Sequence, residues 1–127
     1  MNFKLSRRSE NNLAGVHPDL VKVVRLALKY SQIDFGITEG LRTEARQKQL
    51  VAAGASKTMK SRHLTGHAVD VVAYVDGAVR WDWALYGIIA QAFEKASAEL
   101  GVPIIWGGSW SSFPDGPHFE LDRRRYP

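Results

Sequence analysis

The sequence contains no cysteine among its 127 residues. This absence excludes disulfide bonds, thiolate metal sites and cysteine nucleophiles, so any metal ion must be held by histidine, aspartate or glutamate side chains. It does not discriminate between redox compartments, because oxidising and reducing environments both tolerate a chain without thiols. No window approaches the roughly 20 consecutive apolar residues of a transmembrane helix, so membrane insertion is not expected.

Other common sequence features are also missing. The opening MNFKLSRRSENNLAG is basic but has no apolar run, so we predict no secretory signal peptide. There is no repeat, low-complexity segment or linker, and the length suits one domain with its own core, predicted over residues 1–127. No glycine-rich phosphate loop is recognisable.

The charge balance is positive, with 17 Lys and Arg against 13 Asp and Glu and a formal net charge of +4. Such a balance favours an anionic partner, and nucleic acid, phospholipid and bacterial cell wall all qualify. Much of the excess lies near the two ends of the chain, which is also typical of solvated termini. The sequence lacks a recognition-helix or aromatic-stacking pattern, so nucleic acid is not the expected partner.

Hydrophobic periodicity and turn residues predict the secondary structure. Residues up to Val16 look like an irregular arm, after which helices are predicted over 18–30, 43–53 and 82–100. Strands are predicted over 33–38, 69–74, 78–81, 103–106 and 118–121. Helices and strands mix without a regular βαβ alternation. The pattern therefore predicts an α+β fold with a small, mainly antiparallel sheet flanked by helices.

An aspartate interrupts the β-branched run in SRHLTGHAVDVVAYV, residues 61–75. A carboxylate in a core strand is costly to desolvate unless something pairs with it. Strand alternation turns Asp70 away from its hydrophobic neighbours, and Gly66 allows the preceding loop to fold back so that His63 reaches the same point. With His118 from far downstream, two imidazoles and one carboxylate suit a zinc ion that keeps a fourth position for water.

A rival pairing joins His63 with His67, four residues later. That spacing belongs to the H-E-x-x-H motif, but Leu64 stands where the motif needs glutamate, and Gly66 disfavours a helix. His67 is therefore expected to be a surface or hydrogen-bonding residue.

A zinc ion that activates water also needs a base nearby, and Asp115 stands three residues before His118 in the restricted turn PDGPH. A carboxylate there can take a proton from activated water, although Pro-Asp-Gly is also a common turn. Glu120 is either a hydrogen-bonding partner of a ligand or an exposed strand residue. Arg42, in EGLRT, can hold an oxyanion or a substrate carboxylate, or form a surface salt bridge with Glu39 or Glu44.

These motifs together resemble the LAS group of zinc peptidases. SRHLTGHAVD fits the group's S-x-H-x-x-G-x-A-x-D signature at every fixed position, and DGPH supplies its acidic-x-x-His element. Within the group the chain is similar to VanY-like bacteriophage endolysins, the L-alanyl-D-glutamate endopeptidases, because GVHPDL, EGLRT, WGGSW and DGPHFEL follow in the usual order over roughly residues 5 to 122. Ser109 departs from the WGGDW that is usual in phage relatives.

The resemblance implies a LAS/hedgehog-like metallopeptidase fold and a set of roles. By this resemblance, the Zn²⁺ ligands are His63, Asp70 and His118, and the catalytic carboxylate is Asp115. Arg42 acts in catalysis and substrate binding, and Ser61 lies beside the substrate. The implied reaction is hydrolysis of the L-Ala–D-Glu bond of peptidoglycan stem peptides by a monomer. Such an endolysin is made in the host cytoplasm, acts in the periplasm or cell wall after release, and lyses the host. A D,D-carboxypeptidase that removes terminal D-Ala, and a non-catalytic zinc-binding module, remain alternatives.

Overall fold

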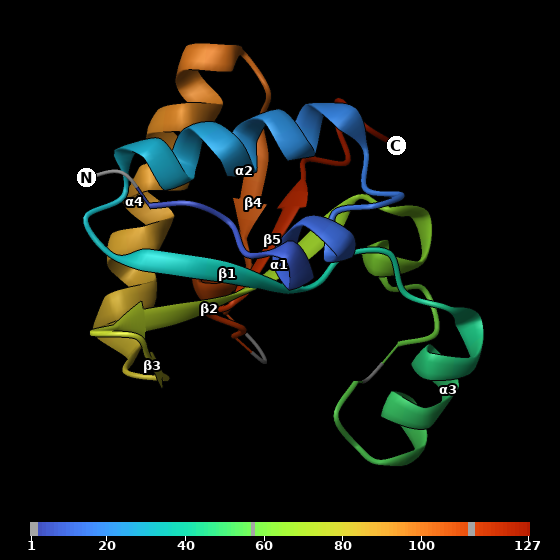
Figure 1. Ribbon diagram of the computed structural model, residues 1–127. Coiled ribbons are helices and arrows are strands. Elements are labelled where there is room, and N and C mark those ends of the chain that lie inside the picture. The colour runs from blue at the N-terminus through green and yellow to red at the C-terminus, as the bar shows by residue number, and fades with distance from the viewer. Residues whose placement is uncertain (1–2, 57, 112–113) are drawn as a thin grey trace.

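A small antiparallel sheet forms the centre of the molecule (Figure 1). The computed structural model describes residues 3–56, 58–111 and 114–127. Four strands run side by side in the order β1 (Asp34–Glu39), β2 (Ala68–Val75), β5 (His118–Leu121), β4 (Ile104–Trp106). A short fifth strand, β3 (Ala78–Arg80), pairs with β2. All four strand pairs are antiparallel, which confirms the predicted α+β fold.

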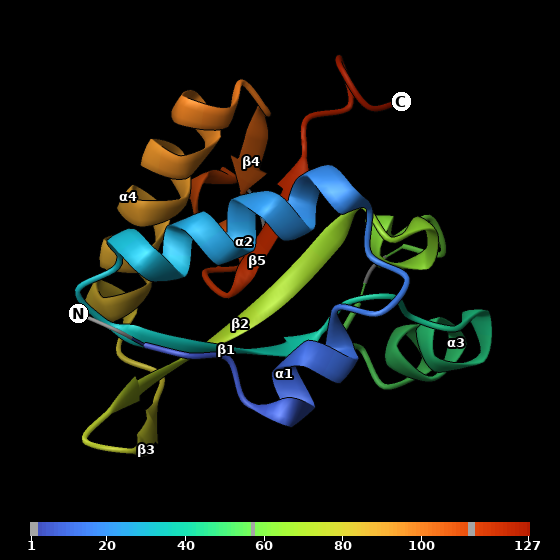
Figure 2. The same cartoon turned by 45° about the horizontal axis from the view of Figure 1, so that its top comes forward.

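Two long helices pack against each other and cover one face of this sheet (Figures 1 and 2). They are α2 (Pro18–Tyr30) and α4 (Trp83–Leu100). Helix α2 is amphipathic, and its buried side chains are Leu20, Val23, Val24, Ala27 and Leu28. Helix α4 ends at Gly101, whose left-handed conformation stops the helix.

The two faces of β2 serve different purposes. Val69, Val71 and Ala73 belong to the hydrophobic core beneath the helices. The alternation of a strand therefore turns Asp70 to the opposite face. In the register of the sheet Asp70 lies directly across from His118 on β5, so both side chains emerge on the side that α2 and α4 leave uncovered.

The predicted irregular arm up to Val16 is wrong, because the chain forms helix α1 (Arg7–Asn12) there. Its sequence, RRSENN, has no hydrophobic periodicity that could have indicated a helix. The helix is held by polar contacts instead. Ser6 caps its N-terminus, Ser9 Oγ accepts from the Ile37 amide at 2.9 Å, and Asn12 donates to the Ile37 carbonyl at 2.8 Å. Helix α1 thus satisfies backbone groups of the edge strand β1.

A lobe projects from the sheet between β1 and β2 (Figure 1). It contains α3 (Glu44–Ala52), which begins at the cap residue Thr43, and a single 3₁₀ turn, η1 (Arg62–Thr65). The prediction of a helix over 43–53 is thereby confirmed to within a residue. Within the described part of the chain, no helix combines the length and apolar character needed to cross a membrane.

Candidate metal centre

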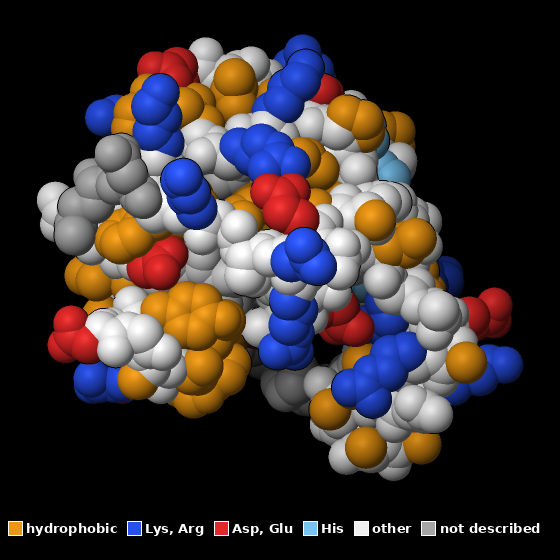
Figure 3. All heavy atoms as spheres, viewed as in Figure 1, with side chains coloured by type: hydrophobic (Ala, Val, Ile, Leu, Met, Phe, Trp, Pro, Cys, Tyr) orange, Lys and Arg blue, Asp and Glu red, His pale blue; other side chains and the backbone are white. Residues whose placement is uncertain are grey.

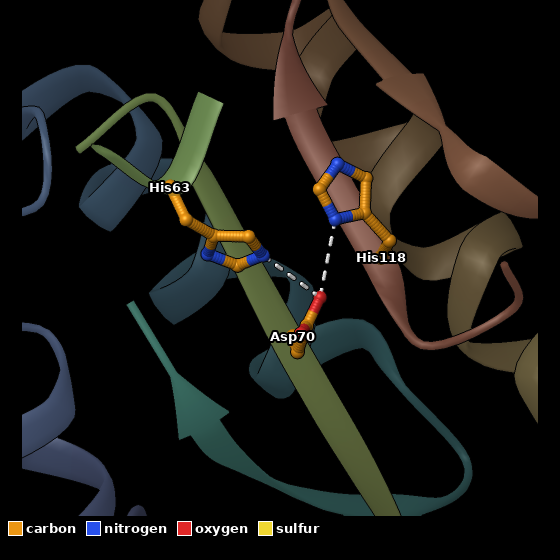
Figure 4. Close-up of side chains that lie close together, drawn as sticks. All are labelled: His63, Asp70 and His118. Atoms are coloured by element: carbon orange, nitrogen blue, oxygen red, sulfur yellow. Dashed lines mark hydrogen bonds and ion pairs between the residues drawn. The ribbon is translucent and has the colours of Figure 1, made fainter. Parts of the chain in front are cut away.

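Three side chains from separate elements point toward one another in Figure 4. His63 lies on η1, Asp70 on β2 and His118 at the start of β5. Ser61 caps η1 by accepting a hydrogen bond from the His63 amide at 3.2 Å, and Gly66 ends it with a φ of 74°. A Cβ at Gly66 would overlap the Gly15 carbonyl oxygen, so the tight return that brings His63 to the cluster requires glycine.

The candidate ligand atoms lie within 4.8 Å of one another. Asp70 Oδ1 is 3.1 Å from His63 Nε2 and 3.1 Å from His118 Nδ1. The imidazole rings are edge to face, with centroids 5.0 Å apart. Two nitrogens and one carboxylate oxygen therefore surround a single point, which one divalent ion can contact.

The remaining ring nitrogens are held by partners outside the cluster. His63 Nδ1 donates to the Gly40 carbonyl at 2.8 Å, which leaves Nε2 facing Asp70. His118 Nε2 bonds Glu120 Oε1 at 2.9 Å, which leaves Nδ1 facing Asp70. Such partners fix the orientation and tautomer of metal-binding histidines. Glu120 is thus buried and is a hydrogen-bonding partner of His118. This is the first of the two roles predicted for it, and the prediction of an exposed strand residue is wrong.

The charges of the cluster favour a cation. Burial alone would raise the pKa of Asp70 and lower that of His118. Hydrogen bonds reverse both effects: the histidines hold the pKa of Asp70 well below its usual range, while Asp70 and Glu120 raise the pKa of His118 to about 9. His118 thus carries positive charge between two carboxylates, and a metal ion can supply that charge instead.

Asp115 lies on the turn that leads into β5. Its amide donates to the Gly107 carbonyl at 2.9 Å, and its carbonyl accepts from the His118 amide at 3.2 Å. Trp106 Nε1 donates to the Gly116 carbonyl at 2.7 Å and so fixes the same turn. Burial raises the pKa of the Asp115 carboxyl above its usual range, and the negative charge of Asp70 raises it further.

Arg42 is buried beside the cluster, with its side chain 9% exposed. It forms an ion pair with Glu39, donates to Gln47 Oε1 at 2.7 Å, and lies 3.8 Å from Asp70 Oδ2. Ser61 Oγ is 3.5 Å away. The predicted salt bridge with Glu39 therefore exists, but inside the site rather than on the surface.

The sequence motifs do not reveal Gln47, the one buried side chain of α3. Besides accepting from Arg42, its amide donates to Ser56 Oγ at 2.9 Å and to the Thr58 carbonyl. Gln47 thereby ties Arg42 to the far loop of the lobe. A polar residue in a helix of low hydrophobicity carries no sequence signal for burial, so only the tertiary contacts identify it.

A cavity of about 570 Å³ contains the cluster, Asp115 and Arg42. The lobe that contains α3 lines one side of the cavity, and the other side is lined by Trp110, Asp115, His118, Glu120 and Arg123. Figure 3 shows a hollow between the lobe, at the lower right, and the body of the molecule. Trp110 lines this cavity, while Trp106 packs against Phe119.

Comparison with known proteins agrees with this arrangement. The model of the phage L-alanyl-D-glutamate peptidase family matches residues 1–125. The chain belongs to this family.

Relatives of this peptidase family member span nearly its whole length. The L-alanyl-D-glutamate peptidase of Escherichia phage T5 is 40% identical over 99% of this chain and 94% of its own length. The Bacillus subtilis endopeptidase CwlK is 31% identical over 85% of this chain and 74% of its own. The crystal structure of the L-Ala D-Glu endopeptidase ChiX of Serratia marcescens superposes with a TM-score of 0.92 at 55% identity, covering 98% of this chain and 94% of that one.

The resemblance inferred from the SRHLTGHAVD and DGPH motifs is thus confirmed at the level of the family. All six candidate site residues of this peptidase line one cavity: Arg42, Ser61, His63, Asp70, Asp115 and His118. His67 lies outside the cluster, bonded to Thr65 Oγ1 at 2.7 Å, as its predicted hydrogen-bonding role requires. The individual roles of the six residues stay predictions.

Proposed function

We propose that this chain is a zinc-dependent endopeptidase that hydrolyses the L-Ala–D-Glu bond of peptidoglycan stem peptides. The convergence of His63, Asp70 and His118 in a cavity that also holds Asp115 carries the proposal. The names of the relatives supply the bond, and the positive net charge suits an acidic wall substrate. We further propose that residues 1–127 act as one catalytic domain and as a monomer.

The donor set supports zinc as the metal. Two imidazole nitrogens and one carboxylate, with no thiolate, are typical of catalytic zinc sites, where a fourth position stays open. His63, Asp70 and His118 would hold the ion. When bound, zinc supplies Lewis-acid polarisation of a carbonyl and lowers the pKa of water.

Asp115 is proposed as the general base and acid. It takes the proton of the attacking water and later returns it to the amine nitrogen of the leaving D-Glu. Its pKa, raised by burial and by Asp70, suits both steps, because a carboxyl group nearer neutrality accepts and releases a proton more evenly.

Arg42 is proposed to bind the substrate at the carbonyl that is attacked. Its guanidinium lines the cavity beside Asp70, with Nη2 3.8 Å from Asp70 Oδ2. Glu39 and Gln47 hold the guanidinium in place, and Ser61 lies at hydrogen-bond distance from it. A preorganised donor of this kind stabilises the negative charge that develops on the oxygen.

The location of action is part of the same proposal. The substrate places the enzyme at the bacterial cell wall or in the periplasm. We propose that it is made in the cytoplasm of a phage host, reaches the wall after release, and lyses the host.

The test is digestion of purified peptidoglycan followed by mass analysis of the products. The wild-type chain is expected to release fragments cut between L-Ala and D-Glu, whereas loss of single D-Ala residues would assign a different bond. An Asp115→Asn variant should keep one zinc per chain and lose activity by about 100-fold or more. The matched control is Asp76→Asn, at an exposed turn outside the cavity, which should hydrolyse like the parent. An Asp115→Asn variant as active as that control would refute the assigned role.

A further inference from the structure

Two positively charged side chains that line the cavity have no carboxylate within hydrogen-bond distance among the described residues. The basic side chains that line it are Arg42, Lys60 and Arg123. Arg42 is buried and already paired with Glu39, close to Asp70. Lys60 and Arg123 differ from Arg42 in that their positive charge is not already neutralised by a close carboxylate, so it is available to an anionic group of the substrate.

Lys60 stands on the lobe side of the cavity. Among the residues that the structure describes, no carboxylate oxygen lies within ion-pair distance of its ammonium group. Its amide donates to Thr58 Oγ1 at 2.9 Å, which orients the backbone just before Ser61. The side chain is exposed, so it can move onto a bound molecule without breaking an existing bond.

Arg123 stands on the opposite side, directly after β5. Its Nε is 3.9 Å from Glu120 Oε2, which is longer than a hydrogen bond, and 62% of its side chain is exposed. Glu120 has other partners, because its Oε1 bonds His118 and its Oε2 faces the buried Arg62. Arg123 thus lies beside the cluster of candidate metal ligands, but the cluster does not neutralise its positive charge.

The neighbouring arginines behave differently. Arg124 pairs with Asp122, with Nη2 and Oδ2 2.6 Å apart. Arg62 donates to the carbonyls of Leu121 and Tyr126, at 3.2 and 2.6 Å, and so holds the final segment of the chain. Of the three consecutive arginines that begin at Arg123, only that residue lines the large cavity among the described residues.

The proposed substrate needs a cation at this place. A glutamyl residue has two carboxyl groups and only one joins the next residue, so the other remains a free carboxylate near the nitrogen of the scissile bond. The acidic side chains that line the cavity would repel it. A second cavity of about 400 Å³ adjoins the first, and Lys60 and Arg123 line both, so the pair stands where a peptide would pass from one to the other.

We infer that Lys60 and Arg123 together bind the free carboxylate of D-Glu and so determine specificity for a glutamyl residue after the scissile bond. This inference rests on the proposed L-Ala–D-Glu cleavage. Arg123 provides a planar pair of donors, and Lys60 a mobile point charge from the other side of the cavity.

The experiment compares two synthetic stem peptides that differ only in this group, one with the free carboxylate of D-Glu and one with the corresponding amide. The wild-type zinc enzyme is expected to prefer the carboxylate peptide by at least about 10-fold in kcat/KM. Lys60→Gln and Arg123→Gln should each lose about 10-fold on the carboxylate peptide and little on the amide, and the double variant should lose the preference. Because both side chains are exposed, thermal unfolding should stay within about 1 °C of the parent.

Matched controls are Lys48→Gln, on the exposed side of α3, and Arg125→Gln, after the arginine pair. Both lower the net charge equally but lie outside the cavity lining, so they should keep the full preference. Equal hydrolysis of both peptides by the wild-type chain would overturn the inference, as would equal losses on both peptides in the two variants. Failure of the proposed function looks different: the wild-type chain would then leave the L-Ala–D-Glu bond of both peptides intact, which overturns the inference as well.

Discussion

Replacing Gln47 by alanine tests whether one buried amide holds the α3 lobe in place. The side chain is fully buried and makes three hydrogen bonds, to Arg42, Ser56 and Thr58. One of the three joins a charged guanidinium, so together they contribute about 3 kcal/mol to the stability of the folded lobe. The truncation also leaves the Thr58 carbonyl without this donor. We therefore expect the equilibrium constant for opening of the lobe to rise by about 100-fold.

Amide hydrogen exchange followed by mass spectrometry measures this opening directly. Peptides from residues 44–56 of the Gln47→Ala variant should exchange about 100-fold faster, while those from α2 and α4 should be unchanged, because the core does not depend on the lobe. Activity should fall as well, since Arg42 loses one of the contacts that orient it. The control is Gln49→Ala, an exposed position on the same helix. Equal exchange in the two variants would refute the reasoning.

Three further predictions concern the backbone, the pH dependence and the metal. Gly66→Ala should destabilise the fold by about 3 kcal/mol or more in thermal unfolding, because its positive φ and the overlap with the Gly15 carbonyl both oppose a side chain. Gly87 lies in a helix with open space around it, so Gly87→Ala should instead raise the free energy of unfolding by up to about 1 kcal/mol. Equal effects at both sites would contradict this contrast. Burial raises the pKa of Asp34, so the charged carboxylate destabilises the fold at pH values above that pKa. Asp34→Asn should therefore raise the unfolding temperature at pH 7 but not at pH 3. A gain at both pH values would be inconsistent with a charge effect. Chelation should abolish hydrolysis, and zinc at 100 times its Kd should restore it. The same zinc concentration should raise the free energy of unfolding by about 2.7 kcal/mol. A His118→Ala variant that zinc stabilises equally would argue against this site.

Much of the fold follows from local sequence patterns. The alternation that turns Asp70 away from the core appears as predicted. The turn at Asp76-Gly77 and the helix stop at Gly101 likewise depend on neighbouring residues. Both turn residues have positive φ, which explains the Asp-Gly choice. Helix α1 could not be predicted in this way, because contacts with the distant residue Ile37 stabilise it.

The candidate site shows the same division between local and distant effects. The spacing of His63 and Asp70 and the turn before His118 are visible in the sequence, and these residues meet as expected. The carbonyl of Gly40 and the amide of Gln47 were not predicted, because backbone acceptors and buried amides carry no motif. Residues that orient a site are therefore harder to find than the residues that they orient.

The pairing of Asp70 with His118 across β2 and β5 would couple binding of the proposed zinc ion to folding. A slip of one residue between these strands would turn one of the two side chains into the hydrophobic core, and the ion would lose a ligand. Only a chain with correctly aligned central strands could then hold the proposed zinc ion with all three ligands. The ion would thereby favour the native strand pairing over shifted alternatives during refolding.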